Sequence, residues 1–257
     1  MPPITGHSVL IIGGTSGIGF AVAKLALAAG ASRVAIASSN STRIKTALQD
    51  LRSEFPNAQI LGHECDLSHD DVEDRLETLF MEVTATADHD DDDSFLLDHI
   101  IYTAGRPVVK PIHDITLPFI HQSGHLSFVA PLLVAKLTPR FIKSRYTSSL
   151  IFTTGRISEK PTPGWSIVAS FATGLHGMTR NLAVDLKPVR VNLVSPGATD
   201  TELWGANREK IKEAMAKDSL LGKVGTAEEV AEAYIYLMKD TNATGACVST
   251  SGGILLQ

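Results

Sequence analysis

The residues best suited to chemistry lie in the glycine turn of residues 13–19, Gly-Gly-Thr-Ser-Gly-Ile-Gly. Glycine adds no Cβ, so backbone N–H groups at a helix start can approach an anion that the helix dipole also favours. The spacing predicts contacts to the pyrophosphate of a dinucleotide from Gly13, Thr15, Ser16, Gly17 and Ile18. A tight strand-to-helix turn without a ligand is the alternative. The two small hydroxyl residues in the turn favour the binding site.

A second group of polar residues follows the next apolar run and consists of Ser38, Ser39, Asn40 and Arg43. A dinucleotide fold that selects NAD usually presents an acid here to the ribose 2′-hydroxyl, and an acid would repel a 2′-phosphate. This stretch offers hydroxyls, an amide and a guanidinium instead, which predicts NADP(H) as the cofactor. A polar helix N-cap explains the same residues. The two interpretations are compatible.

Apolar runs predict the elements that position these groups. Buried strands are expected near 9–12, 33–37, 59–62, 99–102, 149–155, 189–195 and 247–250. Helical spacing is expected near 18–30, 44–55, 70–83, 126–142, 165–186, 208–217 and 228–239. The alternation predicts an α/β fold with a doubly wound parallel sheet of about seven strands.

Composition limits the remaining function classes. With 257 residues and 44% hydrophobic content, the chain predicts one domain over 1–257. A net charge of -5 argues against nucleic acid and anionic membranes as partners. Two cysteines without metal-type spacing argue against disulfides and a metal site, and residues 88–93 lack the glycine and glutamate of a calcium loop, which favours a solvated loop. The lack of a signal-like start or a long apolar run predicts a soluble cytoplasmic protein.

Several of these motifs, in this order, resemble the short-chain dehydrogenase/reductase family over nearly the whole chain. The motifs are 13–19, Asp66, 103–105, 196–201 and 251–253. The resemblance implies a seven-stranded Rossmann sheet, assembly into homodimers or homotetramers, and a site for NADP(H). It also implies further cofactor contacts from Asp66, Leu67, Thr103, Ala104, Gly105, Thr153, Pro196, Gly197, Ala198 and Thr201.

The family's usual proton donor has no counterpart in this alignment. Placing residues 177–180 on the family's matching helix puts Val168 at the catalytic Tyr and Ala172 at the Lys. Thr154 then falls near the family's Ser, and Ser127 near its helix Asn. Hydride transfer to a ketone leaves an alkoxide that an acid must protonate, and neither Val nor Ala can do so. An iminium carbon is already cationic, so its reduction needs no proton.

A narrower resemblance rests on residues 9–20, 131–137, 161–165 and 233–240. These stretches are similar to fungal reductase/Diels-Alderases of the malbrancheamide and paraherquamide type, which also lack the Tyr-Lys pair. The resemblance implies NADPH-dependent reduction of an iminium or azadiene and stereocontrolled [4+2] cyclisation of an apolar nitrogen heterocycle. The chain differs from those enzymes where Thr162 replaces an Asp and Ser127 replaces an Arg.

We therefore expect an apolar pocket over the nicotinamide, bounded by Ser127, Thr154, Trp165, Val168 and Phe171, with Thr154 and Trp165 as catalytic contacts. Trp165 is equally compatible with plain packing. Two other functions stay open, namely an oxidoreductase for another small apolar substrate and an inactive dinucleotide-binding module. Small residues along 165–186 predict close packing, including against a partner subunit.

Overall fold

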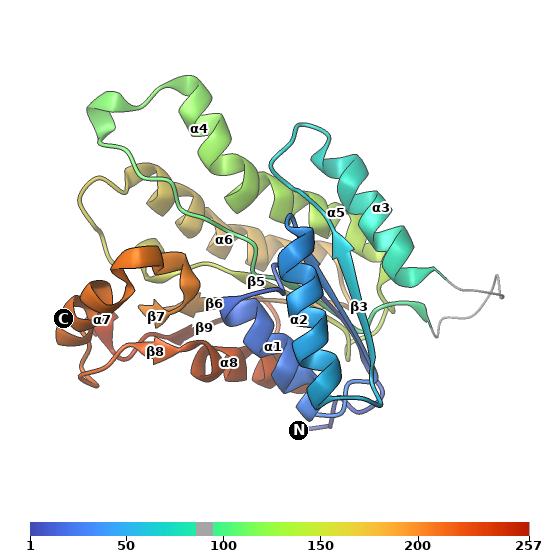
Figure 1. The fold of residues 1–257 in the computed structure, drawn as a ribbon. Coiled ribbons are helices and arrows are strands. Elements are labelled where there is room, and N and C mark those ends of the chain that lie inside the picture. Colours follow the sequence, from blue (N-terminus) through green and yellow to red (C-terminus); the bar gives the residue numbers. More distant parts are fainter. Residues whose placement is uncertain (86–94, 257) are drawn as a thin grey trace.

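The computed structural model describes residues 1–85 and 95–256, and its centre is a parallel seven-stranded sheet (Figure 1). The strand order is β3-β2-β1-β4-β5-β6-β9. The bounds are β1 Ser8–Ile12, β2 Arg33–Ser38, β3 Gln59–Glu64, β4 His99–Tyr102, β5 Ser149–Thr153, β6 Arg190–Pro196 and β9 Cys247–Thr250. The predicted doubly wound sheet is confirmed, and the aspartate-rich stretch 88–93 lies outside the described residues.

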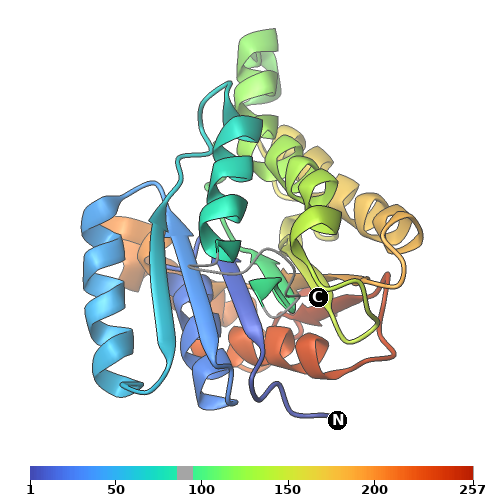
Figure 2. The same cartoon turned by 90° about the vertical axis from the view of Figure 1, so that its right-hand side faces the viewer.

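Helices cover both faces of this sheet (Figure 2). On one face lie α1 Gly17–Ala28, α2 Ser41–Glu54 and α8 Ala227–Lys239. On the other lie α3 Val72–Thr84, α5 Ala130–Phe141 and α6 Ser166–Asp185. In β1, Val9 and Ile11 belong to the apolar core on the face covered by α1, α2 and α8. Leu10 and Ile12 belong to the core on the face covered by α3, α5 and α6. Because β1 is buried on both faces, its residues from Val9 to Ile12 are all apolar, which is why the strand shows no alternation of apolar and polar residues.

The helix predicted over 126–142 is longer than expected and interrupted. It consists of α4 Leu117–Gly124, a π-helical turn His125–Val129, and α5. The side chain of Thr116 caps α4 by accepting the N–H of Phe119 at 3.4 Å. Only Phe119 and Gly124 of α4 are buried, so this segment has no apolar stripe that the sequence could reveal.

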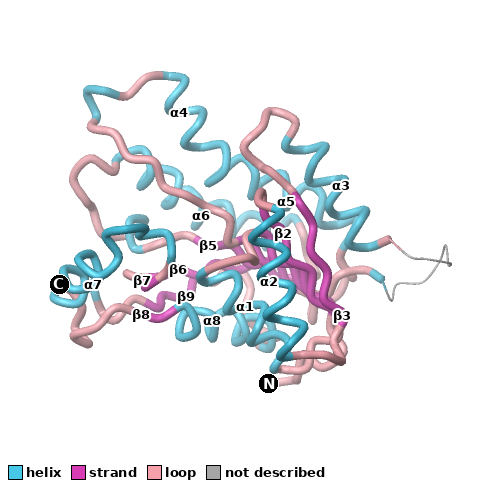
Figure 3. The backbone as a smooth tube through the Cα atoms, in the orientation of Figure 1, coloured by secondary structure: helices cyan, strands magenta, loops and turns pink. Residues whose placement is uncertain are grey.

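The strand order reverses between β1 and β4, and the sheet therefore has a topological switch point there. In open α/β sheets, ligands bind outside the carboxyl ends of the strands at that point. Beside β6 and β9 lies a small sheet that the sequence did not predict, formed by β7 Thr199–Asp200 and β8 Gly225–Thr226. The helix α7 Arg208–Lys217 lies next to it (Figure 3). No helix in the described residues has the length and apolar character needed to span a bilayer.

Candidate functional site

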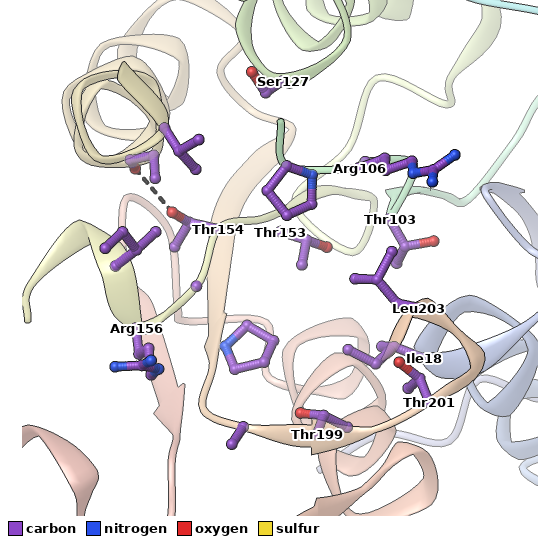
Figure 4. A pocket seen from close by; sticks show the side chains of 18 of the residues that line it. Ile18, Thr103, Arg106, Ser127, Thr153, Thr154, Arg156, Thr199, Thr201 and Leu203 are labelled. Carbon is purple, nitrogen blue, oxygen red and sulfur yellow. Dashed lines mark hydrogen bonds between the residues drawn. The ribbon is translucent and has the colours of Figure 1, made fainter. Parts of the chain in front are cut away.

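A cavity of about 510 Å³ lies at the carboxyl ends of the central strands (Figure 4). Its walls come from β4, β5 and β6, from the start of α1, and from α6 and α7. The sequence-predicted site residues that meet here are Ile18, Thr103, Ala104, Gly105, Ser127, Thr153, Thr154, Trp165, Val168, Pro196, Gly197, Ala198 and Thr201. Residues that are far apart in the chain, such as Ile18 and Thr201, thus line the same cavity.

The glycine turn packs too tightly for side chains. A Cβ on Gly13 would lie 2.6 Å from the backbone nitrogen of Ala104, and Gly13 has a φ of +96°. A Cβ on Gly19 would lie 2.2 Å from the carbonyl oxygen of Gly13. Both distances are shorter than any van der Waals contact, so only glycine permits this approach of α1 to β1 and β4.

The start of α1 binds a carboxylate that belongs to the protein itself. Ser16 is the N-cap but makes no capping hydrogen bond, and the first turn has no acidic residue. The N–H of Gly17 instead donates to Oε2 of Glu202 at 3.1 Å. Because a carboxylate already occupies this donor, the turn fits the pyrophosphate that the sequence predicts there.

The predicted adenosine end lies beyond the cavity, past the carboxyl end of β2. Asn40 caps α2 by accepting the N–H of Arg43 at 2.8 Å, so the N-cap interpretation is confirmed. The side chains of Ser39, Asn40 and Arg43 remain exposed, while Ser38 is half-buried. Their contact with a 2′-phosphate stays a prediction.

The carboxyl end of β3 supplies Asp66 and the buried Leu67. Asp66 accepts hydrogen bonds from the hydroxyl of Ser68 at 2.7 Å and from its N–H at 3.0 Å. These bonds lower the pKa of Asp66 and hold it as a carboxylate. Asp66 and Leu67 do not line the cavity, and their cofactor contacts stay predictions.

Three hydroxyl groups of the site already donate hydrogen bonds to other groups of the protein. Thr154 Oγ1 donates to the carbonyl of Ala172 at 2.8 Å, the hydrogen bond that Figure 4 marks. Thr153 Oγ1 donates to the carbonyl of Tyr102 at 2.7 Å and lies 2.6 Å from the hydroxyl of Tyr234, which therefore donates to it. Ser127 Oγ donates to the carbonyl of Ser123 at 2.6 Å. These groups present lone pairs, not acidic protons.

The two tyrosines near Thr153 are both unsuited to supply the missing acid. Tyr102 lines the cavity, but its hydroxyl donates to the carbonyl of Leu126 at 2.7 Å and burial raises its pKa far above that of an ordinary tyrosine. Tyr234 does not line the cavity. Burial raises its pKa far above that of an ordinary tyrosine, and its hydroxyl is held by Thr153. Val168 and Ala172, which the sequence alignment places at the family's Tyr and Lys, both line the cavity with apolar side chains.

The prediction for Phe171 is wrong, because its side chain does not line the cavity. On α6, the residues facing the cavity are Val168, Ala172 and Leu175, with Trp165 just before the helix. Phe171 turns instead toward α4, where its ring lies against Gly124 and 5.8 Å from the ring of Phe128.

The small residues of α6 are explained partly within the chain. A Cβ on Gly174 would lie 2.8 Å from the Phe128 ring, so this glycine makes room for the π-helical turn. Gly177 has nothing within 4 Å and faces outward. Packing of α6 against a second subunit stays a prediction.

Sequence reasoning missed several residues of the site. Arg106 and Arg156 line the cavity, as do Trp204 and Met215 from the segment after β7. Arg106 directly follows Gly105, and Arg156 directly follows the Thr154-Gly155 pair. Because these motifs end strands at the predicted site, the sequence could have indicated both arginines. The α7 segment carries no periodic apolar pattern that points to a site, because none of its residues is buried.

Comparisons with known proteins agree with this geometry. A family model described as an SDR-like Rossmann domain matches residues 3–257. The chain is similar to short-chain dehydrogenase/reductase ATR9 of Stachybotrys chlorohalonatus, with 46% identity over 260 residues and 100% of both chains covered. It is also similar to short-chain dehydrogenase/reductase malC of Malbranchea aurantiaca, with 40% identity over 263 residues, 99% of this chain and 96% of the relative.

Among solved structures, the MalC reductase/Diels-Alderase from Malbranchea aurantiaca superimposes with a TM-score of 0.90. The sequence identity is 39%, and the match covers 99% of this chain and 98% of that chain. The Rossmann fold of this family is one that binds nicotinamide dinucleotides. With its glycine turn, switch-point cavity and full-length match, the chain belongs to the short-chain dehydrogenase/reductase family.

Proposed function

We propose that the protein is an NADP(H)-binding biosynthetic enzyme that steers a [4+2] cyclisation of an apolar nitrogen heterocycle in the cavity above the nicotinamide. The observation that carries this proposal is the absence of an available acid. Within the described part of the chain, the cavity is lined by no Asp, Glu, His or Lys. The hydroxyl of its lining tyrosine, Tyr102, donates to the carbonyl of Leu126, and the hydroxyls of Thr153, Thr154 and Ser127 also donate to protein acceptors.

A cycloaddition suits such a cavity because it develops little charge and needs neither a nucleophile nor a proton. Holding the diene and the dienophile in a reactive pose can lower the barrier by several kcal/mol. Trp165 and Val168 supply apolar surface for that purpose, and the lone pairs of Thr154 and Ser127 can orient N–H groups of the substrate. The likeness to the MalC reductase/Diels-Alderase supports the same reaction class.

The cofactor site supports NADP(H) over NAD(H). Gly13, Thr15, Ser16, Gly17 and Ile18 would hold the pyrophosphate, and Ser38, Ser39, Asn40 and Arg43 would surround the 2′-phosphate. When bound, the nicotinamide can accept or donate a hydride. For the cyclisation, the protein would use the bound ring as an apolar pocket floor.

The cyclisation is tested by giving the purified protein a preformed azadiene with NADP⁺, with NADPH or without cofactor, and measuring the enantiomeric excess of the product. We expect a clear excess with either cofactor form and a smaller one without it. Trp165→Ala should lower the excess, whereas Tyr146→Ala, at an exposed tyrosine away from the cavity, should leave it unchanged. Racemic product under all three conditions would leave a dinucleotide-binding module as the better interpretation.

Hydride transfer to the substrate is the second candidate, supported by the likeness of the chain to the MalC reductase/Diels-Alderase. The charge of the cavity bears on its substrate. Arg106 and Arg156 line the cavity without an acidic neighbour in the lining of the described chain, so a cationic iminium would meet like charge. A neutral azadiene is favoured as the hydride acceptor, and the nitrogen anion that hydride addition leaves would take its proton from solvent, because the described lining offers no available acid. Stoichiometric oxidation of NADPH during product formation would establish the reductase reaction.

A further inference from the structure

The cavity contains a positive charge without a counterion. Arg156 is half-buried and lies in the short 3-10 turn Arg156–Ser158 that follows β5. A guanidinium keeps its charge at any ordinary pH, and buried charges in proteins are normally paired. Among the described residues Arg156 makes no ion pair, and its one recorded side-chain contact is from Nη2 to the sulfur of Met215 at 3.9 Å, a weak acceptor.

The acids next in sequence to the cavity-lining residues are engaged elsewhere. Asp200 pairs with Arg208 and with Lys212, the latter at 3.1 Å. Glu202 accepts the N–H of Gly17. Glu159, three residues after Arg156, is exposed and accepts from Ser195 at 3.4 Å. The guanidinium thus faces the cavity with its donors available to a ligand.

The backbone that carries Arg156 is fixed. The carbonyl of Ser158 accepts from Thr173 of α6 at 2.9 Å, and the Ser158 hydroxyl lies 3.1 Å from Nε2 of His176 and donates to the Gly155 carbonyl at 2.8 Å. Arg156 therefore stands at a set place below Thr154, whereas Arg106 stands across the view beside Thr103 (Figure 4). Arg106 is exposed, so water already solvates its charge.

We propose that Arg156 binds an anionic oxygen of the substrate, a carboxylate or an enolate, and so selects anionic over cationic heterocycles. The planar guanidinium fork matches a pair of oxygens in two parallel hydrogen bonds, which a single ammonium cannot do. This inference rests on the proposed use of the cavity as the substrate site. It adds the charge of the substrate and the residue that recognises it.

The test measures binding of matched probes to the NADP⁺-saturated protein by calorimetry. N-acetyl-L-tryptophan carries a carboxylate, N-acetyl-L-tryptophanamide is its neutral counterpart, and L-tryptophanamide is cationic. Because hydrogen bonds between charged groups are stronger than those to a neutral group, we expect the carboxylate to bind about tenfold or more tightly than the neutral amide. The cation should bind most weakly.

Variants assign the preference to the residue. Arg156→Met should abolish the preference for the carboxylate while leaving NADP⁺ affinity unchanged, and Arg156→Lys should retain part of it. Arg180→Met, at an exposed arginine of α6 that does not line the cavity, is the matched control and should bind like the parent. Equal binding of all three probes, no binding of the carboxylate, or an unchanged preference in Arg156→Met would each overturn the assignment.

The two proposals can fail separately. If the carboxylate preference depends on Arg156 but the azadiene gives racemic product, the binding group stands and the cyclisation does not. If the product is enantioenriched while the probes bind equally, only the anion-binding role of Arg156 is lost.

Discussion

Thr154 keeps its hydroxyl hydrogen on the carbonyl of Ala172, and this one bond decides what the residue can offer. A family Ser in its place would be expected to donate to a substrate, but here only lone pairs are available. Beside it stand Val168 and Ala172, which cannot carry a proton. We therefore expect slow turnover of simple ketones and alcohols.

Restoring the acid should restore carbonyl reduction. In Val168→Tyr/Ala172→Lys, a phenol with a pKa lowered by the new ammonium would protonate the alkoxide, and general-acid catalysis contributes about 10²- to 10⁴-fold. Oxidation of NADPH with a panel of small ketones measures the gain. Val168→Phe is the matched control, since it adds the ring without the acid. Rapid ketone reduction by the parent protein would show that another proton donor exists.

Arg43 should set the cofactor preference. Its backbone is fixed by Asn40, and its exposed side chain follows a strand end that lacks an acid. Arg43→Ala should weaken NADP(H) binding about tenfold and leave NAD(H) unchanged, because one charge-assisted contact is lost. Calorimetry with both cofactors measures this, and Lys45→Ala, on the same exposed helix, serves as the control. Equal affinities of the parent for NADP(H) and NAD(H) would contradict the prediction.

At the scale of elements, the start of α1 is the most constrained junction. Gly19→Ala would place a methyl group 2.2 Å from the Gly13 carbonyl, so the helix must shift away from β1. Overpacking of this kind costs about 1–3 kcal/mol, and the shift should also abolish NADP(H) binding. Gly177→Ala on α6, with open space around it, should instead stabilise by about 0.5–1 kcal/mol. Urea unfolding compares the two.

The elements differ in how far the sequence could reveal them. Strands such as β1 are buried on both faces, so their apolar runs predicted position and order correctly. The helix α4 and the small β7–β8 sheet have few buried residues and left no periodic signal. For the same reason Phe171 was misplaced, since the pattern of α6 did not show which apolar side chains face α4. Arg156 was not predicted because it lies two residues beyond Thr154, the last residue of this stretch that the family resemblance assigns to the site.

At the scale of the whole molecule, the sheet has a polar cluster at the end opposite the cavity. Asp98 accepts from Lys143 and Arg145 at 2.9 Å each and from the N–H of Ser8. Burial alone would raise the pKa of Asp98, but these bonds outweigh it and lower the pKa. His99 is fully buried between His7 at 2.9 Å and Ser149 at 2.8 Å.

This cluster predicts loss of stability in mild acid. Burial is the main cause that lowers the pKa of His7 and lowers that of His99 well below 6.5. Above pH 6.5 neither state binds these protons, so the stabilisation is complete. Below it the unfolded chain takes up protons that the folded chain refuses, and stability falls. Thermal unfolding from pH 8 to 5 should show the decline, and His7→Gln should reduce it.

The exposed His113 provides the control, because His113→Gln should leave the pH dependence of unfolding unchanged. A midpoint temperature that stays constant from pH 8 to 5 would show that the half-buried His7 and the buried His99 take up protons without cost. A decline that His7→Gln does not alter would place its origin in another group.

The carboxylate of Glu202 on the N–H of Gly17 has a kinetic consequence. An arriving pyrophosphate needs that same donor, and Glu202 opens the segment 202–207 that leads into α7 and Met215. Binding of the cofactor must displace the Glu202 side chain. Because the segment that begins at Glu202 leads to Met215, this displacement is coupled to the part of the cavity wall that contacts Arg156. We predict that this displacement slows the association of the dinucleotide. Glu202→Gln should bind NADP(H) about tenfold more tightly, because a competing charge is gone. Stopped-flow mixing with NADP(H) should show faster association for that variant than for the parent, since the side chain that holds the donor no longer carries a charge; equal association rates would contradict the prediction.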